Sequence, residues 1–359
     1  MTLVLSLYLS RIFLKLTLAA AAGLAVLVQL IDLIDAAPDI LDRGQGAQGI
    51  AYYASLRLPM ILDQVLPLSV LIGALLTFAI LARNSEITAL RACGYTVGRV
   101  VLLLLPTALR LSVAHLVIGD RMVPRLQTDL AGWWAATEPA VPENEEAREP
   151  AWLRVEGSLV SIARVLEDGR RLEGVRIYQR DADNVATSRI VAERAVFDGG
   201  TWRLENAVAT RFAAGAFGAQ PPQDAVWRVG LGPGNVVEAL TPMGDVSAAS
   251  ARAILAGNRV GNGSPTFYRT ALQRTFAEPA TSLVMLLLAV PAAIASRRSG
   301  ESGKRLALAL GLGLVFLLSD GILTALGQAG AVPAPFAAWG PLALFACLGG
   351  LILHRLERA

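Results

Sequence analysis

Histidine and cysteine are almost absent from this chain, which has two of each among its 359 residues. His115 and His354 lie outside the polar middle of the chain, so no histidine there can assist a nucleophile or build a His-rich metal site. Cys93 and Cys347 are far apart and show no CxxC spacing, which indicates two free thiols without a disulfide framework or a metal site. We therefore expect a protein that is not an enzyme and that holds no cofactor.

Charged residues are also scarce. They make up 17% of the chain, whereas hydrophobic residues make up 54% and the mean hydropathy is +0.51. The hydrophobic fraction and the mean hydropathy lie above those of an ordinary soluble domain and the charged fraction lies below, which indicates that lipid solvates much of the chain. Apolar segments with at most one Asp, Glu, Lys or Arg are long enough for a helix of about 20 residues to cross roughly 30 Å of hydrocarbon. We predict six transmembrane helices, at residues 12–31, 58–82, 100–119, 276–295, 306–326 and 336–353.

Lysine and arginine gather on one side of the predicted helices. Connections rich in these residues stay in the cytoplasm, which puts both termini there and the polar middle in the periplasm of a bacterium. Cleavage of the first segment as a secretory signal would break this alternation, so we expect the chain to keep it. The residues on the cytoplasmic side are Arg11, Lys15, Arg83, Arg91, Arg99, Arg297, Arg298, Lys304, Arg305, Arg355 and Arg358.

Residues between 120 and 270 show a different periodicity. Short segments alternate β-branched or aromatic residues with polar ones, and turn signals such as Asp198-Gly199-Gly200 separate them, as is typical of an all-β sandwich or jelly roll. Residues 139–150, rich in proline and glutamate, are expected to form a solvated loop. The predicted strands lie at 152–155, 159–165, 174–179, 188–197, 201–204 and 226–229.

These patterns predict an α-helical membrane protein with a periplasmic, jelly-roll-like β-domain inserted between its third and fourth transmembrane helices. Residues 1–119 hold the first three helices, 120–270 the β-domain with its linkers, and 271–359 the last three helices. Because the β-domain has no catalytic set, we expect it to bind, guide or dock another molecule.

The cytoplasmic connection at residues 84–94 contains the most distinctive local motif. Asn84 or Ser85 can cap a helix there, Glu86 suits its positive end, and Gly94 can end it in a left-handed conformation. A short helix with a small apolar face fits a groove of a soluble partner. An interfacial helix that only joins two transmembrane helices is an equally simple interpretation.

The order asparagine, serine, glutamate, then leucine, arginine, alanine, x, glycine resembles the coupling segment of the LptF/LptG permeases, the membrane subunits of the bacterial lipopolysaccharide exporter. The resemblance covers nearly the whole chain, including six transmembrane helices with one periplasmic β-domain between the third and fourth. Leu58-Pro59 and Leu66-Pro67 bracket the start of the second helix as in that family. Two segments, Ile31-Asp32-Leu33-Ile34-Asp35 and Gly44-Gln45-Gly46, are more similar to the LptG branch than to the LptF branch.

The resemblance implies a set of partners. Members of the family form a heterodimer of an LptF-type and an LptG-type permease in the inner membrane, on a dimer of the ATPase LptB. LptC is a further membrane partner and LptA is the periplasmic bridge. Lipopolysaccharide enters between the permeases and moves onto the β-domains, while the ATPase uses ATP. By position, Glu86, Leu90, Arg91 and Gly94 would place the coupling helix in the ATPase groove.

The family's lipid cavity is lined mainly by the first transmembrane helix and by faces of the second and fifth. Gln29 stands where some relatives have a basic residue one turn before the aspartate, here Asp32, which puts direct phosphate contact from this position in doubt. The positive charge would then come from other residues, and for each of them snorkelling to the interface is an equal alternative. These residues are Arg57, Arg121, Arg125, Arg269 and Arg274.

One carboxylate lies within the fifth predicted helix. Asp320 is costly in hydrocarbon and is expected to face the protein interior or the cavity, either in a structural pair or in gating. Residues 299–305 superficially resemble a phosphate-binding loop, but the first glycine and the hydroxyl residue after the lysine are missing, so ATP hydrolysis must occur in another subunit. Rival functions are a membrane-anchored sensor or scaffold and a mechanotransmitting ABC subunit that moves no lipid.

Overall fold

The computed structural model describes residues 2–137, 151–155, 158–166, 169–180, 185–213, 216–219, 223–233, 236, 246–257, 261, 263–291 and 302–358. The chain divides into two compact units. A helical unit comprises Met1–Glu138, Asp245–Ala248 and Thr266–Ala359, and a β unit comprises Pro139–Gly244 and Ala249–Pro265. The predicted loop at 139–150 lies outside the described residues. The domain ranges 1–119, 120–270 and 271–359 stay predictions.

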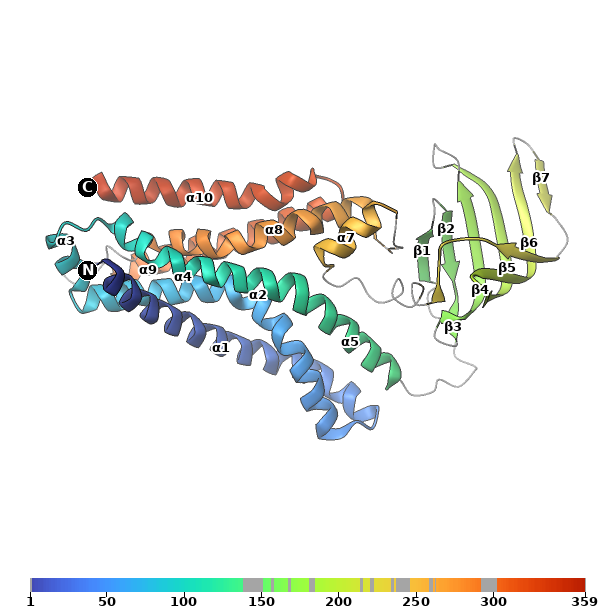
Figure 1. Ribbon diagram of the computed structural model, residues 1–359, viewed down its shortest axis with the longest axis horizontal. Helices are drawn as coiled ribbons and strands as arrows, with labels where there is room; N and C mark the ends of the chain where they lie inside the picture. Colours follow the sequence, from blue (N-terminus) through green and yellow to red (C-terminus); the bar gives the residue numbers. More distant parts are fainter. Residues whose placement is uncertain are drawn as a thin grey trace. The chain divides into compact units, whose positions relative to one another are not determined.

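Long helices build the helical unit (Figure 1). The marked N- and C-terminal ends and the short helix α3 lie at the same end of this bundle. A π-helical turn, η1 (Ile118–Met122), continues α4 into α5. The helices are α1 (Thr2–Asp42), α2 (Gly46–Arg83), α3 (Glu86–Ala92), α4 (Val97–Val117), α5 (Val123–Ala136), α8 (Pro265–Leu288), α9 (Ser302–Gln328) and α10 (Ala334–Arg358).

Five helices of the described residues are long and apolar enough to cross a membrane: Val4–Asp42, Gly46–Arg83, Val97–Trp134, Leu306–Gln328 and Ala334–Arg355. The sixth predicted crossing, 276–295, begins in α8 and extends past the described residues. The described part of α8 carries Arg269, Arg274 and Glu278, and these charges reduce its hydropathy. Five candidate crossings are therefore present, and the count of six stays a prediction.

The first two helices are much longer than their predicted apolar segments. α1 has 41 residues and α2 has 38, so each extends roughly 60 Å at 1.5 Å per residue. A bilayer core is about 30 Å thick. The length of an apolar segment in the sequence therefore predicts only the part of each helix that lies in the bilayer. The α1–α2 hairpin is long enough to project well beyond the lipid.

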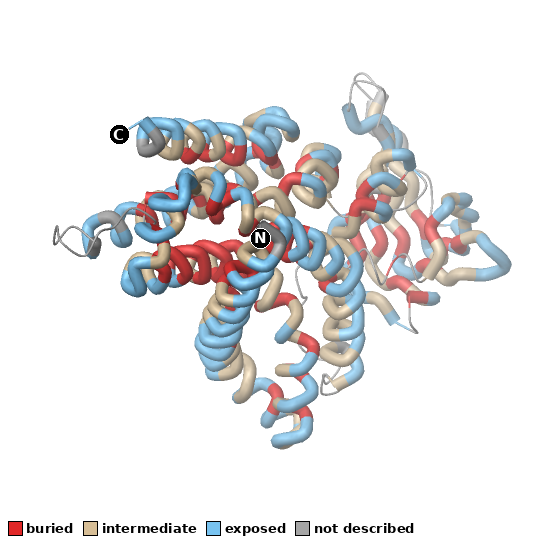
Figure 2. Tube along the Cα trace, turned by 60° about the vertical axis from the view of Figure 1, so that its left-hand side comes forward, coloured by how far each residue is buried: buried red, intermediate tan, exposed pale blue. Residues whose placement is uncertain are grey.

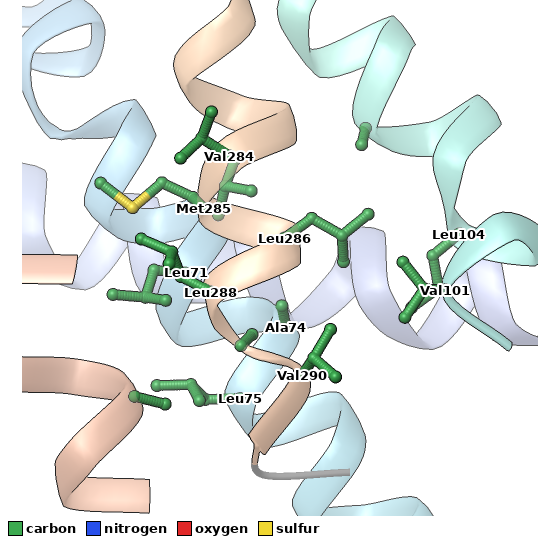
Figure 3. Packing of buried hydrophobic residues seen from close by; sticks show 14 of the residues in the cluster. Leu71, Ala74, Leu75, Val101, Leu104, Val284, Met285, Leu286, Leu288 and Val290 are labelled. Atoms are coloured by element: carbon green, nitrogen blue, oxygen red, sulfur yellow. The ribbon is translucent and has the colours of Figure 1, made fainter. Parts of the chain in front are cut away.

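α2 lies at the centre of the helical unit. In its most apolar window 67% of residues are buried, against 17% in α1 and in α9. Its residues Leu71, Ala74 and Leu75 pack with residues of α4 and α8, including Leu104 and Met285, in one cluster (Figure 3). Buried turns lie where the helices meet, while the outer side of α10 is exposed (Figure 2). α1 and α9 therefore present much of their apolar surface outward.

Small residues let the helices approach closely. A Cβ atom at Gly73 of α2 would lie 2.7 Å from the backbone Cα of Thr17 in α1. A Cβ at Gly313 of α9 would meet the side chain of Leu71 in α2. Close backbone contact of this kind replaces the hydrophobic driving force that is missing between helices in lipid. The absence of a side chain at Gly73 thus allows α2 to lie close to Thr17 of α1.

The described strands of the β unit form one antiparallel sheet of eight strands in the order β1-β2-β4-β5-β6-β7. β3 also pairs with β4, and β8 also pairs with β6. The jelly-roll arrangement stays a prediction. The strands are β1 (Ala151–Val155), β2 (Ser158–Ile162), β3 (Arg164–Leu166), β4 (Arg171–Arg180), β5 (Ala186–Asp198), β6 (Thr201–Ala213), β7 (Ala216–Ala219) and β8 (Gln223–Trp227).

One face of this sheet holds a separate hydrophobic core. Alternate residues of the strands point to the same face, so Val160 and Ile162 of β2 share it with Trp202 and Leu204 of β6. The Nε1–H of Trp202 donates a hydrogen bond of 2.7 Å to the carbonyl oxygen of Leu231. The predicted turn at 198–200 joins β5 to β6, and both of its glycines have positive φ, as a tight hairpin requires. The core thus fixes the pairing of the long strands.

Candidate functional site

The cytoplasmic motif forms the short helix α3, Glu86–Ala92. Gly94 ends it with φ +82°. The N–H of Gly94 donates to the carbonyl oxygen of Arg91 at 3.0 Å, and the N–H of Tyr95 donates to that of Leu90 at 3.0 Å. These two bonds form a Schellman motif, which satisfies carbonyl groups that the helix end would leave unpaired. The role of Gly94 as a helix terminator is therefore confirmed.

The predicted cap at the start of α3 is wrong. Ser85 occupies the cap position, but its backbone is left-handed, with φ 62°, and within the described residues its side chain makes no capping hydrogen bond. The Asn84 Nδ2 group instead donates to Glu86 Oε1 at 3.1 Å. A standard cap needs an extended backbone, and the sharp turn from α2 into α3 does not provide it.

The faces of α3 also differ from the prediction of an apolar face for a partner. Ile87 is 7% exposed and lies in the main hydrophobic cluster of the helical unit, and Leu90 packs against that cluster. The apolar side of α3 therefore anchors it to its own chain. Its exposed surface combines small side chains with one cation and one thiol: Thr88, Ala89, Arg91, Ala92 and Cys93.

Glu86 connects α3 to the first helix. The hydroxyl group of Tyr8 in α1 lies 3.2 Å from each carboxylate oxygen of Glu86, and the amide of Asn84 binds Oε1. Glu86 is partly exposed, so its carboxylate is reachable from outside the chain. The sequence motif singled out Glu86, but the contact with Tyr8, 78 residues away, exists only in the folded chain.

The candidate cavity residues Asp32 and Arg57 form an ion pair between α1 and α2. Arg57 Nη2 lies 2.5 Å from Asp32 Oδ1, and Nε donates to Oδ2 at 3.1 Å. This two-point geometry orients the guanidinium group beside α1. Gln29 lies one turn earlier in α1, and neither its amide nitrogen nor its oxygen has a hydrogen-bond partner among the described residues. The fold thus pairs Arg57 with Asp32 and places this cation at the residue one helical turn after Gln29.

Other predicted cavity residues lie elsewhere. Arg121 in η1 and Arg125 in α5 are exposed, as is Arg269 in α8. Asp320 of α9 instead pairs with Arg274 of α8, with 3.0 Å between Asp320 Oδ2 and Arg274 Nη1. The pairing that the sequence offered as one alternative is present. A role of Asp320 in gating stays a proposal.

Arg274 is the centre of a polar network between α8 and α9. Its Nη2 group lies 2.6 Å from Glu278 Oε1, one turn along α8, and its Nη1 group also donates to the hydroxyl oxygen of Thr324. The Thr324 hydroxyl donates to the carbonyl oxygen of Asp320 at 2.7 Å. One guanidinium group thus pairs with two carboxylates. Removing its charge would leave both carboxylates without a cation.

A second polar contact joins α2 to α4. His115 Nε2 lies 3.5 Å from Asp63 Oδ1, and the histidine side chain is buried. Gly119 allows the following turn to pass close to Asp63, because a Cβ atom there would lie 3.1 Å from Oδ1. Sequence reasoning did not assign these residues a role, although an ionisable group inside an apolar segment is the signal that identified Asp320.

The described residues contain no group of three or more His, Cys, Asp or Glu side chains that could hold a metal ion. Their notable chemistry is instead recognition: an exposed cation and carboxylate at α3, and a guanidinium group held beside α1.

Comparisons with known proteins cover nearly the whole chain. The family model described as "Lipopolysaccharide export system permease LptF/LptG" matches residues 7–355. The lipopolysaccharide export system permease protein LptG of Escherichia coli strain K12 is 26% identical over 345 residues, which are 92% of this chain and 93% of that protein. The LptG protein of Haemophilus influenzae is 23% identical over 350 residues, 94% of this chain and 95% of that protein.

Proposed function

The chain belongs to the LptF/LptG family of lipopolysaccharide export system permeases, and from this premise we propose that it is an LptG-type subunit of an ABC transporter. It extracts lipopolysaccharide from the bacterial inner membrane and passes it to a periplasmic bridge of the LptA type. An LptF-type permease, an LptC-type membrane protein and an LptB-type ATPase dimer complete the complex, and the ATPase uses the ATP. The match along residues 7–355 is the observation that carries this function.

The proposed topology has six crossings, with α8 as the fourth, and both termini in the cytoplasm. The shared position of α3 and both chain ends at one end of the bundle supports it (Figure 1). The β unit then lies in the periplasm. We propose that the apolar residues on its core-facing side shelter acyl chains when the domain takes up lipid, since each methylene shielded from water contributes about 0.8 kcal/mol.

The exposed face of α3 is the proposed contact with the ATPase. Small side chains such as Ala89 and Ala92 let the backbone approach a groove closely, and Arg91 can donate charge-assisted hydrogen bonds to a carboxylate. Ile87 and Leu90 transmit the force instead, because they pack into the cluster that holds the transmembrane helices. Docking of the ATPase and transmission of its force thus use opposite faces of α3.

Arg57 is the proposed cation for a phosphate of the lipid. Its ion pair with Asp32 holds it one helical turn from Gln29, where the first helix has no basic residue of its own. A phosphate that displaces the carboxylate would gain a bidentate partner. The cavity then consists of α1 with faces of α2 and α9.

We expect Arg91→Glu to lower recovery of the ATPase with this chain by about 10- to 100-fold, because it replaces a charge-assisted hydrogen bond with repulsion. Copurification from membranes measures this. Arg99→Glu, which makes the same charge change at an exposed site outside α3, is the control. In a Cys347→Ala background, maleimide labelling of Cys93 reports whether the ATPase covers α3. Equal recovery with Arg91→Glu and wild type would contradict the coupling role.

A photoreactive residue at Gln29 tests the substrate. In the complete complex without ATP we expect lipopolysaccharide adducts at this position, because apolar surface and a nearby cation favour that lipid. The adducts should decrease by about fivefold or more when ATP is supplied, because transport then moves the lipid out of the cavity. The same residue at Leu351, 59% exposed on α10, should capture mainly phospholipid. Phospholipid alone at both positions would favour a subunit that transmits force without moving lipopolysaccharide.

A further inference from the structure

The beginning of α1 is packed against the coupling region. Leu9 and Phe13 are fully buried in the same cluster as Ile87 of α3. The hydroxyl group of Ser6 donates to the carbonyl oxygen of Leu103 in α4 at 3.0 Å. These contacts hold the helix in place without any help from Tyr8, whose side chain is 46% exposed.

Tyr8 adds one directional contact to this packing. Its single hydroxyl hydrogen faces both oxygens of Glu86, each at 3.2 Å. Glu86 is at the same time the carboxylate nearest to the exposed face of α3, where a cation of a docking partner would approach. The carboxylate is therefore shared between α1 and whatever binds α3.

α1 can carry a displacement from this contact to the other side of the membrane. It is one continuous helix from Thr2 to Asp42, so Asp32, which follows Tyr8 by 24 positions, lies about 36 Å away along the helix. Asp32 holds Arg57 by two hydrogen bonds at that distant position. A change in the position of Tyr8 therefore reaches the ion pair through a helix that is buried over only a small part of its length.

We propose that Tyr8 is a positioning residue that joins the coupling helix to α1, so that partner docking at α3 moves the helix that holds the Asp32–Arg57 pair. The inference rests on the proposed function and extends it, since it adds one directional side-chain contact to the packing of Ile87 and Leu90 as a link between docking and the cavity. Tyr8 acts through Glu86 and touches neither ATP nor lipid.

Tyr8→Phe tests the link because it removes only the hydroxyl group from a half-exposed ring. In the complete complex in vesicles that contain lipopolysaccharide, we expect ATP hydrolysis and ATPase recovery to stay within twofold of wild type. The amount of lipopolysaccharide released per ATP should fall five- to tenfold. Tyr52→Phe is the matched control, since Tyr52 is 45% exposed and lies in α2, and it should keep the wild-type ratio.

A double-mutant cycle separates the specific contact from a general loss of structure. Glu86→Gln should lower the same ratio, and the double variant should be no worse than the more affected single variant, because both changes remove one link. An unchanged ratio in Tyr8→Phe, or effects that multiply in the double variant, would overturn the inference while leaving the proposed function intact. A wild-type complex that hydrolyses ATP but releases no lipopolysaccharide would contradict the proposed function itself.

Discussion

Replacing Arg274 with alanine is expected to destabilise the helical unit by about 3–5 kcal/mol, the typical cost of removing one partner from a buried ion pair. Asp320 and Glu278 would then share no cation, although the Asp320 side chain is only 14% exposed. The yield of monodisperse protein after detergent extraction and its thermal midpoint measure the loss.

The control for this variant removes the ion pairs without leaving an unpaired buried charge. Arg274→Met combined with Glu278→Gln and Asp320→Asn leaves no buried charge, so we expect it to recover most of the lost stability. Arg274→Lys should be intermediate, because an ammonium group cannot reach both carboxylates and Thr324 as a guanidinium group does. If Arg274→Ala were as stable as wild type, the network would not contribute to folding.

Trp202→Ala is expected to destabilise the β unit by about 3–5 kcal/mol, because it removes the largest fully buried side chain of the described residues. The change also leaves the carbonyl oxygen of Leu231 without the indole donor and removes the edge contact with Phe197, whose ring centroid lies 5.2 Å away. We expect the thermal midpoint of the β unit in the full chain to fall by roughly 10–20 °C. Limited proteolysis across a temperature series measures this.

Trp202→Phe separates packing from hydrogen bonding. It keeps an aromatic ring in the core and loses the indole N–H, so the expected loss is about 1–3 kcal/mol. Trp227→Phe changes the partner of Trp202 across β6 and β8, where the residue is only partly buried, and should have a smaller effect. A β unit that unfolds at the same temperature in Trp202→Ala and wild type would exclude Trp202 as the centre of this core.

The Arg274 experiment also bears on export. The Arg274 network ties α8 to α9, one of the two least buried membrane helices, and α9 is a proposed wall of the lipid cavity. Loss of the network would therefore disturb transport even in variants that recover their stability. The triple variant thus distinguishes a purely structural pair from one that controls the position of α9.

Some local features of the candidate site follow from the sequence. Gly94 ends α3 because only a residue without a side chain adopts a positive φ at little cost. The end of this helix can therefore be predicted from the sequence. The start of the helix is not predictable in this way. Whether Ser85 caps α3 depends on the direction in which α2 ends, and that direction follows from packing.

The faces of α3 are likewise predicted only in part by the sequence. An apolar residue such as Ile87 indicates a buried face, but the sequence does not say whether the burial occurs against the same chain or a partner. The fold decides for the same chain, because Ile87 is buried in the same cluster as Leu9 and Phe13 of α1. Likewise the sequence predicts that Asp320 faces the protein interior or the cavity, and only the fold shows that its partner is Arg274.

The sequence by itself determined the membrane character of the chain, the β-rich middle and the family resemblance, because hydrophobic length, strand periodicity and local motifs are written in consecutive residues. Only the tertiary structure decided that Tyr8 meets Glu86, that Asp32 holds Arg57 and that Arg274 joins α8 to α9. Each of these contacts joins two helices through side chains that are far apart in sequence, and their approach depends on how all the helices pack at once.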